Sequence, residues 1–456
     1  MTMTSIDALV AAQRSFFAGE ATRSIEFRKQ QLRKLRAALK KWEKPLCDAL
    51  WTDLHKSYEE AYMTEIGLVY GEISDALKNV GRWARRRRKP TPLTGVPSSS
   101  YIIREPLGCA LIMSPWNYPV QLLLSPLVGA IAAGCTALLK PSPYVPNVSQ
   151  ALADMISETF PEEYIAVVQG NRDVNTALLE QRYDLVFFTG SPALGKIVMA
   201  SQAKYLTPLV LELGGKSPCI VDRDADLKIA ARRIVWGKCL NSGQTCIAPD
   251  YLFLHEDIKD AFVEAFKQEL AALYPDGTEH SDYYVHVVRD RAFERLQGYL
   301  KDGKVIAGGH CDPATRWFEP TLLDEVSPDA PVMQEEIFGP IFPIMTFRNR
   351  DEVVKFVTSR EKPLAFYYFG KKSDAWEVLG RTTSGGACIN DVIMHVANSK
   401  IPFGGVGNSG MGSYHSERSF LAFSHERSVL VTPTRIDLQF RYMPYGMFKL
   451  VKKMLD

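Results

Sequence analysis

The sequence lacks several features that would assign it to a specialised class of proteins. Its 456 residues hold 54 lysines and arginines against 52 aspartates and glutamates, and a net charge of +2 argues against a nucleic-acid-binding protein. No cysteine or histidine set has metal-ligand spacing, so we predict no metal site. The N-terminus has no basic start followed by a sustained apolar stretch, which argues against secretion. The eight cysteines are irregularly spaced, so we expect a cytoplasmic protein in a reducing compartment rather than a disulfide-stapled scaffold.

Long hydrophobic runs are also scarce. Residues 119–139 carry no charge over 21 positions, which approaches the length of a membrane-spanning helix. Two prolines and several small residues lower the hydrophobicity of this run, and no second span accompanies it. We therefore interpret it as a buried helix that ends near Gly134 and a buried strand, "CTALLK".

The remaining patterns indicate alternating helices and strands in more than one structural unit. A single core stops growing well below 456 residues, so two or three units are expected. Apolar residues from Ile25 to Leu46 recur at helical spacing, with lysines and arginines between them. Residues 83–100 run from four arginines into proline, glycine and serine, which is typical of an extended arm. Beyond the arm, short apolar runs end in proline, glycine or serine, which predicts βαβ units with ligands at the strand ends.

One of these strand ends has glycines that suit a phosphate group. In "FFTGSPALGKIV", residues 187–198, an apolar run precedes Gly190, Ser191 and Gly195 and then a helical pattern. Free N–H groups at a helix start suit a pyrophosphate. The third glycine of the usual fingerprint is missing, so the spacing alone favours a plain strand-to-helix turn.

Two further stretches hold candidate catalytic groups. Glu212 lies in an apolar strand before two glycines, where it is either paired or held in a cleft that raises its pKa to suit a general base. In "GKCLNSGQTCIAPD", residues 237–250, Cys246 follows Cys239 by seven positions. A redox or metal pair, packed core and one catalytic thiol are the alternatives, and the residues alone favour inert core cysteines.

Taken together, these motifs resemble the aldehyde dehydrogenase superfamily over about the whole chain. The resemblance rests on seven motifs in the family's order: "SPWNYP", "LKPS", "FTGSPALGK", "LELGGKSP", "NSGQTC", "EEIFGP" and "PFGGVGNSGMG". The start "ATRSIEFRKQQLRKL", the stretches "INDVIMH" and "SYHSERSFLAFSHERSV", and the 34 residues from Glu212 to Cys246 resemble the class 3 branch, which acts on fatty and aromatic aldehydes.

The resemblance implies roles for individual residues. Cys246 would attack an aldehyde, and the Asn117 amide with the Cys246 backbone N–H would hold the developing alkoxide. Hydride transfer to nicotinamide would give a thioester, which water activated by Glu212 would hydrolyse to the acid. Cys239 matches no catalytic position. The implied cofactor contacts are Trp116, Lys140, Gly190, Ser191, Gly195, Glu336 and Phe338.

The resemblance also implies an α/β fold in three parts. These are a Rossmann-like NAD(P)-binding domain from residues 1–85 and 104–211, an α/β catalytic domain at 212–402, and a small β-arm for oligomerisation. The arm would comprise residues 86–103 and about 426–440, and would join a homodimer. The implied reaction is oxidation of an apolar aliphatic or aromatic aldehyde. Two alternatives are a coenzyme A-acylating enzyme, against which Glu212 argues, and a non-catalytic thiol-redox or structural member of the fold.

Two further features concern the cofactor and the C-terminus. Many members of the family have a glutamate after "KPS" that binds the adenosine ribose, whereas this chain has Pro143. The missing carboxylate removes repulsion toward a 2′-phosphate, so we expect NAD as cofactor with appreciable use of NADP. The C-terminal "MPYGMFKLVKKMLD" resembles a short interfacial helix that would contact a membrane weakly, and packing at the subunit surface is an equal alternative.

Overall fold

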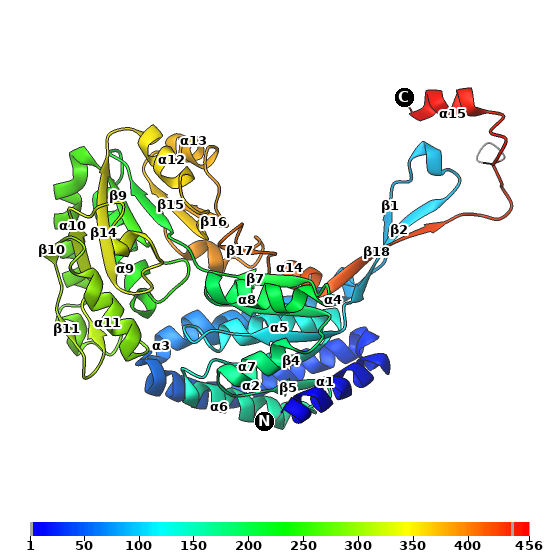
Figure 1. Ribbon diagram of the computed structural model, residues 1–456, viewed down its shortest axis with the longest axis horizontal. Coiled ribbons are helices and arrows are strands. Elements are labelled where there is room, and N and C mark those ends of the chain that lie inside the picture. The colour runs from blue at the N-terminus through cyan, green and yellow to red at the C-terminus, as the bar shows by residue number, and fades with distance from the viewer. Residues whose placement is uncertain (1–2, 439–441, 456) are drawn as a thin grey trace.

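Two parallel-rich sheets and one small antiparallel sheet form the framework of the protein. The computed structural model describes residues 3–438 and 442–455. Figure 1 shows the seven-stranded sheet at one end of the molecule, the N-terminal helices and the six-stranded sheet beside it, and an extended arm at the other end. This arrangement confirms the predicted α/β class.

The six-stranded sheet has the order β17-β7-β6-β3-β4-β5, and all of its pairings are parallel except β17 with β7. Its strands are β3 (Cys109–Met113), β4 (Thr136–Lys140), β5 (Ile165–Val167), β6 (Leu185–Thr189), β7 (Leu209–Glu212) and β17 (Gly410–Met411). Its helices are α1 (Met3–Ala18), α2 (Ile25–Leu54), α4 (Gly67–Trp83), α5 (Gln121–Ala133), α6 (Pro146–Thr159), α7 (Arg172–Leu179) and α8 (Pro192–Ala203). The parallel strands end at one edge, so the motifs that follow them meet there.

The uncharged run at residues 119–139 is core, as predicted. Every residue of α5 is buried, and the helix ends at Gly134, whose φ of 94° is left-handed and favours glycine. The strand β4 follows directly and is also buried throughout. Within residues 3–438 and 442–455, no helix has both the length and the apolar character that crossing a membrane requires.

The predicted amphipathic helix is confirmed as α2. Ser24 caps its N-terminus by accepting a hydrogen bond from the Phe27 N–H over 3.3 Å. Leu32, Leu35 and Leu39 on one face are fully buried, as the spacing predicts. The helix therefore packs one face against α4, α5 and α6 and leaves most of its charged side chains outside, although Arg28 is buried.

The seven-stranded sheet has the order β10-β13-β14-β9-β8-β15-β16, with only β10 antiparallel to its neighbour in the pairings described. Its strands are β8 (Pro218–Val221), β9 (Tyr251–His255), β10 (Lys304–Ala307), β13 (Thr321–Asp324), β14 (Ile341–Phe347), β15 (Ala365–Phe369) and β16 (Gly386–Ile389). Its helices are α9 (Leu227–Cys239), α10 (Lys259–Leu273), α11 (Asp290–Tyr299), α12 (Arg350–Thr358) and α13 (Lys372–Leu379). A short ribbon of β11 (Cys311–Asp312) and β12 (Trp317–Phe318) lies near α11.

The arm contains β1 (Arg87–Lys89), β2 (Ser99–Pro106) and β18 (Ser424–Val431), all antiparallel. Arg104 of β2 pairs with Glu426 of β18 inside the arm, and with Glu417 of α14 (Glu417–Ala422) in the body, both over 2.8 Å. Beyond β18 the chain reaches α15 (Phe448–Leu455) at the end of the arm (Figure 1). Residues 439 and 440 of the expected arm lie outside the described residues, and the division into domains stays a prediction.

Exposed apolar side chains precede and begin α15, among them Met443, Tyr445 and Phe448. This exposure is compatible with both interpretations of the segment, as a membrane-surface helix and as a helix that packs at a subunit surface.

Candidate active site

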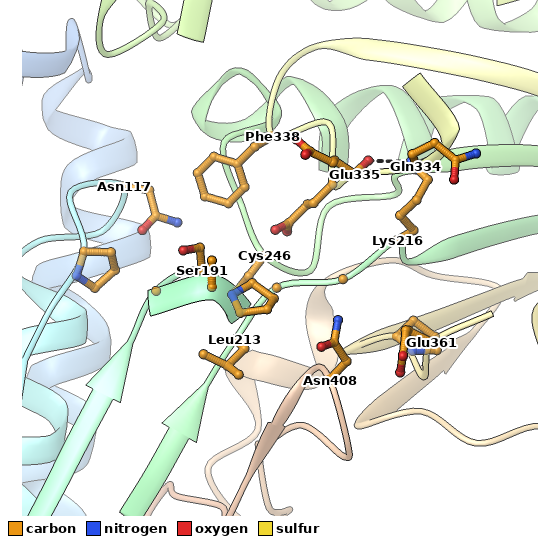
Figure 2. A pocket seen from close by; sticks show the side chains of 18 of the residues that line it. Asn117, Ser191, Leu213, Lys216, Cys246, Gln334, Glu335, Phe338, Glu361 and Asn408 are labelled. Atoms are coloured by element: carbon orange, nitrogen blue, oxygen red, sulfur yellow. Dashed lines mark hydrogen bonds between the residues drawn. The ribbon is translucent and has the colours of Figure 1, made fainter. Parts of the chain in front are cut away.

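A cavity of about 1500 Å³ is lined by residues that follow β3, β6 and β7 of one sheet and by loops and helices of the other. All three predicted catalytic residues, Asn117, Glu212 and Cys246, line it. Five of the seven predicted cofactor contacts line it as well: Trp116, Gly190, Ser191, Glu336 and Phe338. Figure 2 shows Asn117, Cys246 and Phe338 around this one cavity.

Cys246 follows a loop with an unusual backbone. Asn241 and Ser242 both have a φ of 52°, and Gly243 follows with a φ of 70°. Left-handed conformations at two consecutive non-glycine residues cost of order 1–3 kcal/mol each and persist only where the surroundings impose them. The loop therefore directs Cys246 into the cavity at the expense of local strain.

Buried polar contacts hold this strained loop in place. The Asn241 side-chain amide donates to the carbonyls of Asn117 and Gln244 over 3.1 and 3.0 Å. The Asn241 N–H donates to the Glu60 carboxylate over 2.9 Å. The Gln244 side chain donates to the His286 carbonyl over 3.0 Å. These contacts come from distant parts of the chain, so the loop is fixed by tertiary structure.

The Cys246 thiol lies in an environment that disfavours its charge. Burial, together with the nearby carboxyl groups of Glu336 and Glu212, raises the pKa of Cys246, whereas the N–H groups of Cys246 and Ile247 oppose this effect. Cys246 is therefore held as a thiol, and an attack by its sulfur would require a base to accept the proton. Cys239 is a different case, because it is only 1% exposed and does not line the cavity.

Asn117 is held by contacts on both its backbone and its side chain. Its side-chain Nδ2 donates to the Gln244 carbonyl over 3.0 Å, and its own carbonyl accepts from the buried Lys56 Nζ over 3.0 Å. An amide nitrogen carries two N–H groups, so one remains for a ligand in the cavity. Asn117 can thus donate to an oxyanion near Cys246.

Glu212 ends β7 with a buried carboxyl group. It is 3% exposed, and neither carboxylate oxygen has a hydrogen-bond partner among the described residues. Burial alone raises the pKa of Glu212 well above its ordinary range. An unpaired carboxyl group with a raised pKa at a cavity wall is a usable general base.

Glu336 borders the same cavity and lies against a pair of glycines. A Cβ on Gly214 would overlap the Glu336 carboxylate, so only glycine leaves room for it. Burial, with a smaller contribution from Asp250, raises the pKa of Glu336 to about 8. Lys216 supports the loop before Glu336 by donating to the carbonyls of Val332 and Glu335 over 2.8 and 2.9 Å.

A model of the aldehyde dehydrogenase family matches residues 1–429. The chain belongs to the aldehyde dehydrogenase family. The 4,4'-diaponeurosporen-aldehyde dehydrogenase of Staphylococcus aureus is 45% identical over 443 residues, or 96% of each chain. The dimeric NADP-preferring aldehyde dehydrogenase of Canis lupus familiaris is 44% identical over 97% of this chain and 98% of that protein.

A solved structure, the substrate-bound state of Staphylococcus aureus AldH, has a TM-score of 0.97 at 43% identity and covers 99% of both chains. The mouse aldehyde dehydrogenase family 3 member A2 is 45% identical over 92% of this chain. These relatives confirm the predicted family and its class 3 branch, and the protein is an NAD(P)-dependent aldehyde dehydrogenase.

The turn at Gly190 and Ser191, predicted to bind the pyrophosphate, leads into a capped helix. Ser191 is the N-cap of α8 and accepts a hydrogen bond from the Leu194 N–H over 3.4 Å. Gly195 does not line the cavity, because it is buried where a Cβ would lie 2.8 Å from the Leu213 side chain. Gly195 therefore lets α8 pack closely on the chain that follows β7, and its contact with a cofactor stays a prediction.

Lys140 ends β4 and also lies outside the cavity lining. It is 2% exposed, and its Nζ donates to the Pro141 carbonyl over 2.8 Å. Burial lowers the pKa of Lys140 to about 8. A buried cation at the strand edge is available for a ligand hydroxyl group, and its ribose contact stays a prediction.

The sequence does not reveal which residues support the candidate catalytic groups. These residues are Lys56, Glu60, Glu65, Asn241 and Gln244. The clearest available signal was the density of polar residues in "NSGQT", directly before the nucleophile. Within residues 3–438 and 442–455, no group of three histidine, cysteine, aspartate or glutamate side chains could hold a metal ion.

Proposed function

We propose that the protein oxidises an apolar aliphatic or aromatic aldehyde to the carboxylic acid through a thioester on Cys246. The observation that carries this proposal is the shared cavity of Cys246, the unpaired carboxyl group of Glu212 and the free amide N–H of Asn117. A nucleophile, a base and an oxyanion donor are the groups that this reaction needs.

In the first step the Cys246 sulfur attacks the aldehyde carbon, and the thiol proton passes to solvent water. The carbonyl oxygen becomes an alkoxide, which accepts hydrogen bonds from Asn117 Nδ2 and the Cys246 N–H. The bound nicotinamide supplies an acceptor for the hydride that leaves the former aldehyde carbon. The product of this stage is a thioester on Cys246.

In the second step Glu212, after losing its proton to solvent, accepts a proton from a water molecule. The resulting hydroxide attacks the thioester carbonyl, the carbon–sulfur bond breaks, and the carboxylic acid leaves. Glu212 is buried at the cavity wall and has no hydrogen-bond partner among the residues that the structure describes, which is compatible with this role. Hydrolysis by this base makes coenzyme A unnecessary as an acyl acceptor.

Several residues on the cavity wall suit the binding of an NAD(P) cofactor. Gly190 and Gly214 leave backbone open to a ligand, and one oxygen of Glu336 is buried without a partner among the described residues. Glu336 would bind the nicotinamide ribose and Ser191 the pyrophosphate. We expect NAD as cofactor with NADP accepted, because Pro143 places no carboxylate beside the adenosine ribose. Steady-state kinetics test this, and a preference for NAD above roughly a thousandfold would contradict it.

Aromatic side chains around the thiol support an apolar substrate. Trp116, Leu122 and Phe338 line the cavity together with Cys246. The ring centroids of Trp116 and Phe338 lie 5.4 Å apart, so these side chains form an apolar wall. Aldehydes of graded chain length, compared by kcat/KM, should show a rise with apolar length.

The extended arm and one relative bear on the quaternary structure. The relative from Canis lupus familiaris is named dimeric, and together with the arm it favours a homodimer joined through the arm. All eight cysteines are free, which suits a reducing cytoplasm. Sedimentation of a variant that lacks residues 424–438 should show a monomer if the arm joins the subunits.

Two cysteine variants test the reaction. Cys246→Ala should lose aldehyde oxidation by at least three orders of magnitude while it keeps its fold. Cys239→Ala, seven positions earlier, should keep activity and serves as the matched control. Acid must form without coenzyme A. Full activity of Cys246→Ala would contradict the proposal, and acid formation that requires coenzyme A would favour the acyl-transfer alternative.

A further inference from the structure

We propose that Arg289, supported by the ring of Tyr144, binds the 2′-phosphate of NADP and so determines how well the protein uses that cofactor. The inference rests on the proposed cofactor site and goes beyond it by assigning a residue to the phosphate. It concerns a cation that the reaction itself does not use.

Arg289 is a cation without a counter-charge. Its side chain lines the cavity, and its Nε is buried with no hydrogen-bond partner in the part of the chain that the structure describes. No ion pair involves Arg289 among those residues, whereas nearby Arg316 pairs with Asp290 over 3.5 Å. Arg295, on α11, donates to the carbonyls of Glu336 and Ile337. Arg289 is therefore available to a ligand, whereas Arg295 and Arg316 are held by other groups of the protein.

The ring of Tyr144 fixes where the guanidinium lies. The guanidinium carbon is 4.2 Å from the centroid of that ring. A stacked guanidinium keeps its N–H edge free, and this edge matches two oxygens of a phosphate group. Tyr144 comes four residues after Lys140, the last residue of β4, so the cation is held at the strand edge that the cofactor is expected to follow.

Pro143, next to Tyr144, stands where many members of the family have a glutamate, so no carboxylate at this position competes with a phosphate for Arg289. Pro143 is exposed and has no charge. A carboxylate at this position would lie next to Tyr144, where it would pair with Arg289 and repel a phosphate. Because residue 143 is proline, no carboxylate at that position pairs with the Arg289 guanidinium beside the proposed adenosine ribose site. The two features together let this site hold a dianionic 2′-phosphate as well as a neutral 2′-hydroxyl group.

The sheet order brings this cation and the phosphate turn to one ligand. The strand β4, before Tyr144, and β6, before Gly190, flank β3 on opposite sides. Two strand spacings separate them, or about 10 Å. A nucleotide that lies across the strand ends can therefore contact the turn at Ser191 with its pyrophosphate while its ribose reaches Arg289.

Calorimetric binding of 2′,5′-ADP and 5′-AMP to the full chain tests the proposal without enzyme turnover, since the two ligands differ only in the 2′-phosphate. The wild type should bind 2′,5′-ADP at least as tightly as 5′-AMP. Arg289→Gln should weaken 2′,5′-ADP by about 10- to 100-fold, the usual range for one charge-assisted contact, and leave 5′-AMP within about twofold. Arg289→Lys should keep part of the affinity for 2′,5′-ADP.

A matched control and a reverse variant sharpen the test. Arg291→Gln changes an exposed arginine that lines the same cavity, and it should alter neither affinity by more than about twofold. Pro143→Glu should weaken 2′,5′-ADP and leave or improve 5′-AMP. Between pH 5.5 and 7 the wild type should bind 2′,5′-ADP more tightly as the 2′-phosphate loses its second proton near pH 6, and Arg289→Gln should show a smaller rise.

Weaker binding of 2′,5′-ADP than of 5′-AMP by the wild type would overturn the assignment. An equal loss of both ligands in Arg289→Gln would also overturn it, because this result indicates a purely structural role. If the folded wild type bound neither nucleotide, the proposed cofactor site itself would be wrong.

Discussion

Lys56 Nζ donates to Glu65 Oε1 over 2.7 Å, and both side chains are fully buried. Lys56 also donates to the Asn117 carbonyl over 3.0 Å, and the other Glu65 oxygen accepts from the Val120 N–H over 2.8 Å. The pair therefore fixes the backbone at Asn117 and just beyond it. Two buried charges gain little as a pair, but the loss of one leaves the other without compensation.

Lys56→Met should accordingly destabilise the protein by about 3–5 kcal/mol, measured by urea unfolding, because Glu65 keeps a buried charge. The Lys56→Met/Glu65→Leu double variant should recover part of this loss. Lys44 forms an exposed pair with Asp48, so Lys44→Met is the matched control and should cost less than about 1 kcal/mol. Equal effects of the two single variants would contradict the role of the buried pair.

Activity should rise with pH because the base and the nucleophile both have raised pKa values. Burial raises the pKa of Glu212 and of Cys246, so both groups are protonated at low pH and activity is lost as pH falls through the raised values. A kcat/KM profile from pH 6 to 10 should show a rising limb above the ordinary carboxyl range. A profile that is flat from pH 6 upward would show that neither group limits the rate.

Gly214→Ala should impair the site with little effect on the fold. The added Cβ would overlap the Glu336 carboxylate and displace it, so kcat/KM should fall at least tenfold. Gly298, inside α11, has open space around an added Cβ, and Gly298→Ala should keep activity and stabilise by about 0.5–1 kcal/mol. Unchanged kinetics in Gly214→Ala would show that Glu336 moves aside at no cost.

Stability should fall as pH drops from about 6.5 to about 4, because the buried His415 and the half-buried His395 are held neutral. The rings of His395 and His415 both stack on Phe403, with centroids 5.9 and 5.4 Å away. Burial lowers the pKa of each to about 4, from an ordinary 6.5. The unfolded chain therefore binds more protons across this range, and each histidine contributes up to about 1.4 kcal/mol per pH unit.

Urea midpoints between pH 4 and 7 measure this effect. His395→Phe keeps an aromatic ring beside Phe403 and should reduce the slope. His280, whose side chain is 72% exposed, offers the control His280→Gln, which should leave the slope unchanged. An unaltered slope in His395→Phe would exclude that histidine as a source.

The sequence predicts those parts of the fold whose cause is local. The helix α5 and the strand β4 follow from an uncharged run with glycine at its break, and burial of both confirms that interpretation. The three catalytic candidates follow from motif resemblance, and the structure brings them to one cavity from positions 117, 212 and 246. Hydrophobic periodicity alone would not have predicted that these residues lie close together, because they are positioned by two different sheets.

The supporting residues could not be predicted for a physical reason. Lys56 and Glu65 flank α3 (Tyr58–Ala61), and Glu65 lies in a π-helical turn, Tyr62–Ile66. Such turns lack a sequence signature. The left-handed backbone at Asn241 and Ser242 likewise depends on contacts with distant residues.

The central claim is that the acyl group rests on Cys246 and leaves through Glu212. Its most direct test is the intact mass of Glu212→Gln after mixing with NAD and an aldehyde. Loss of the base should slow hydrolysis by roughly 10²- to 10⁴-fold, so the thioester should accumulate. We predict one added acyl group, equal to the aldehyde less two hydrogens, on the peptide that contains Cys246. An acyl group on Cys239, or a folded variant with NADH formed and no acyl group, would contradict the account.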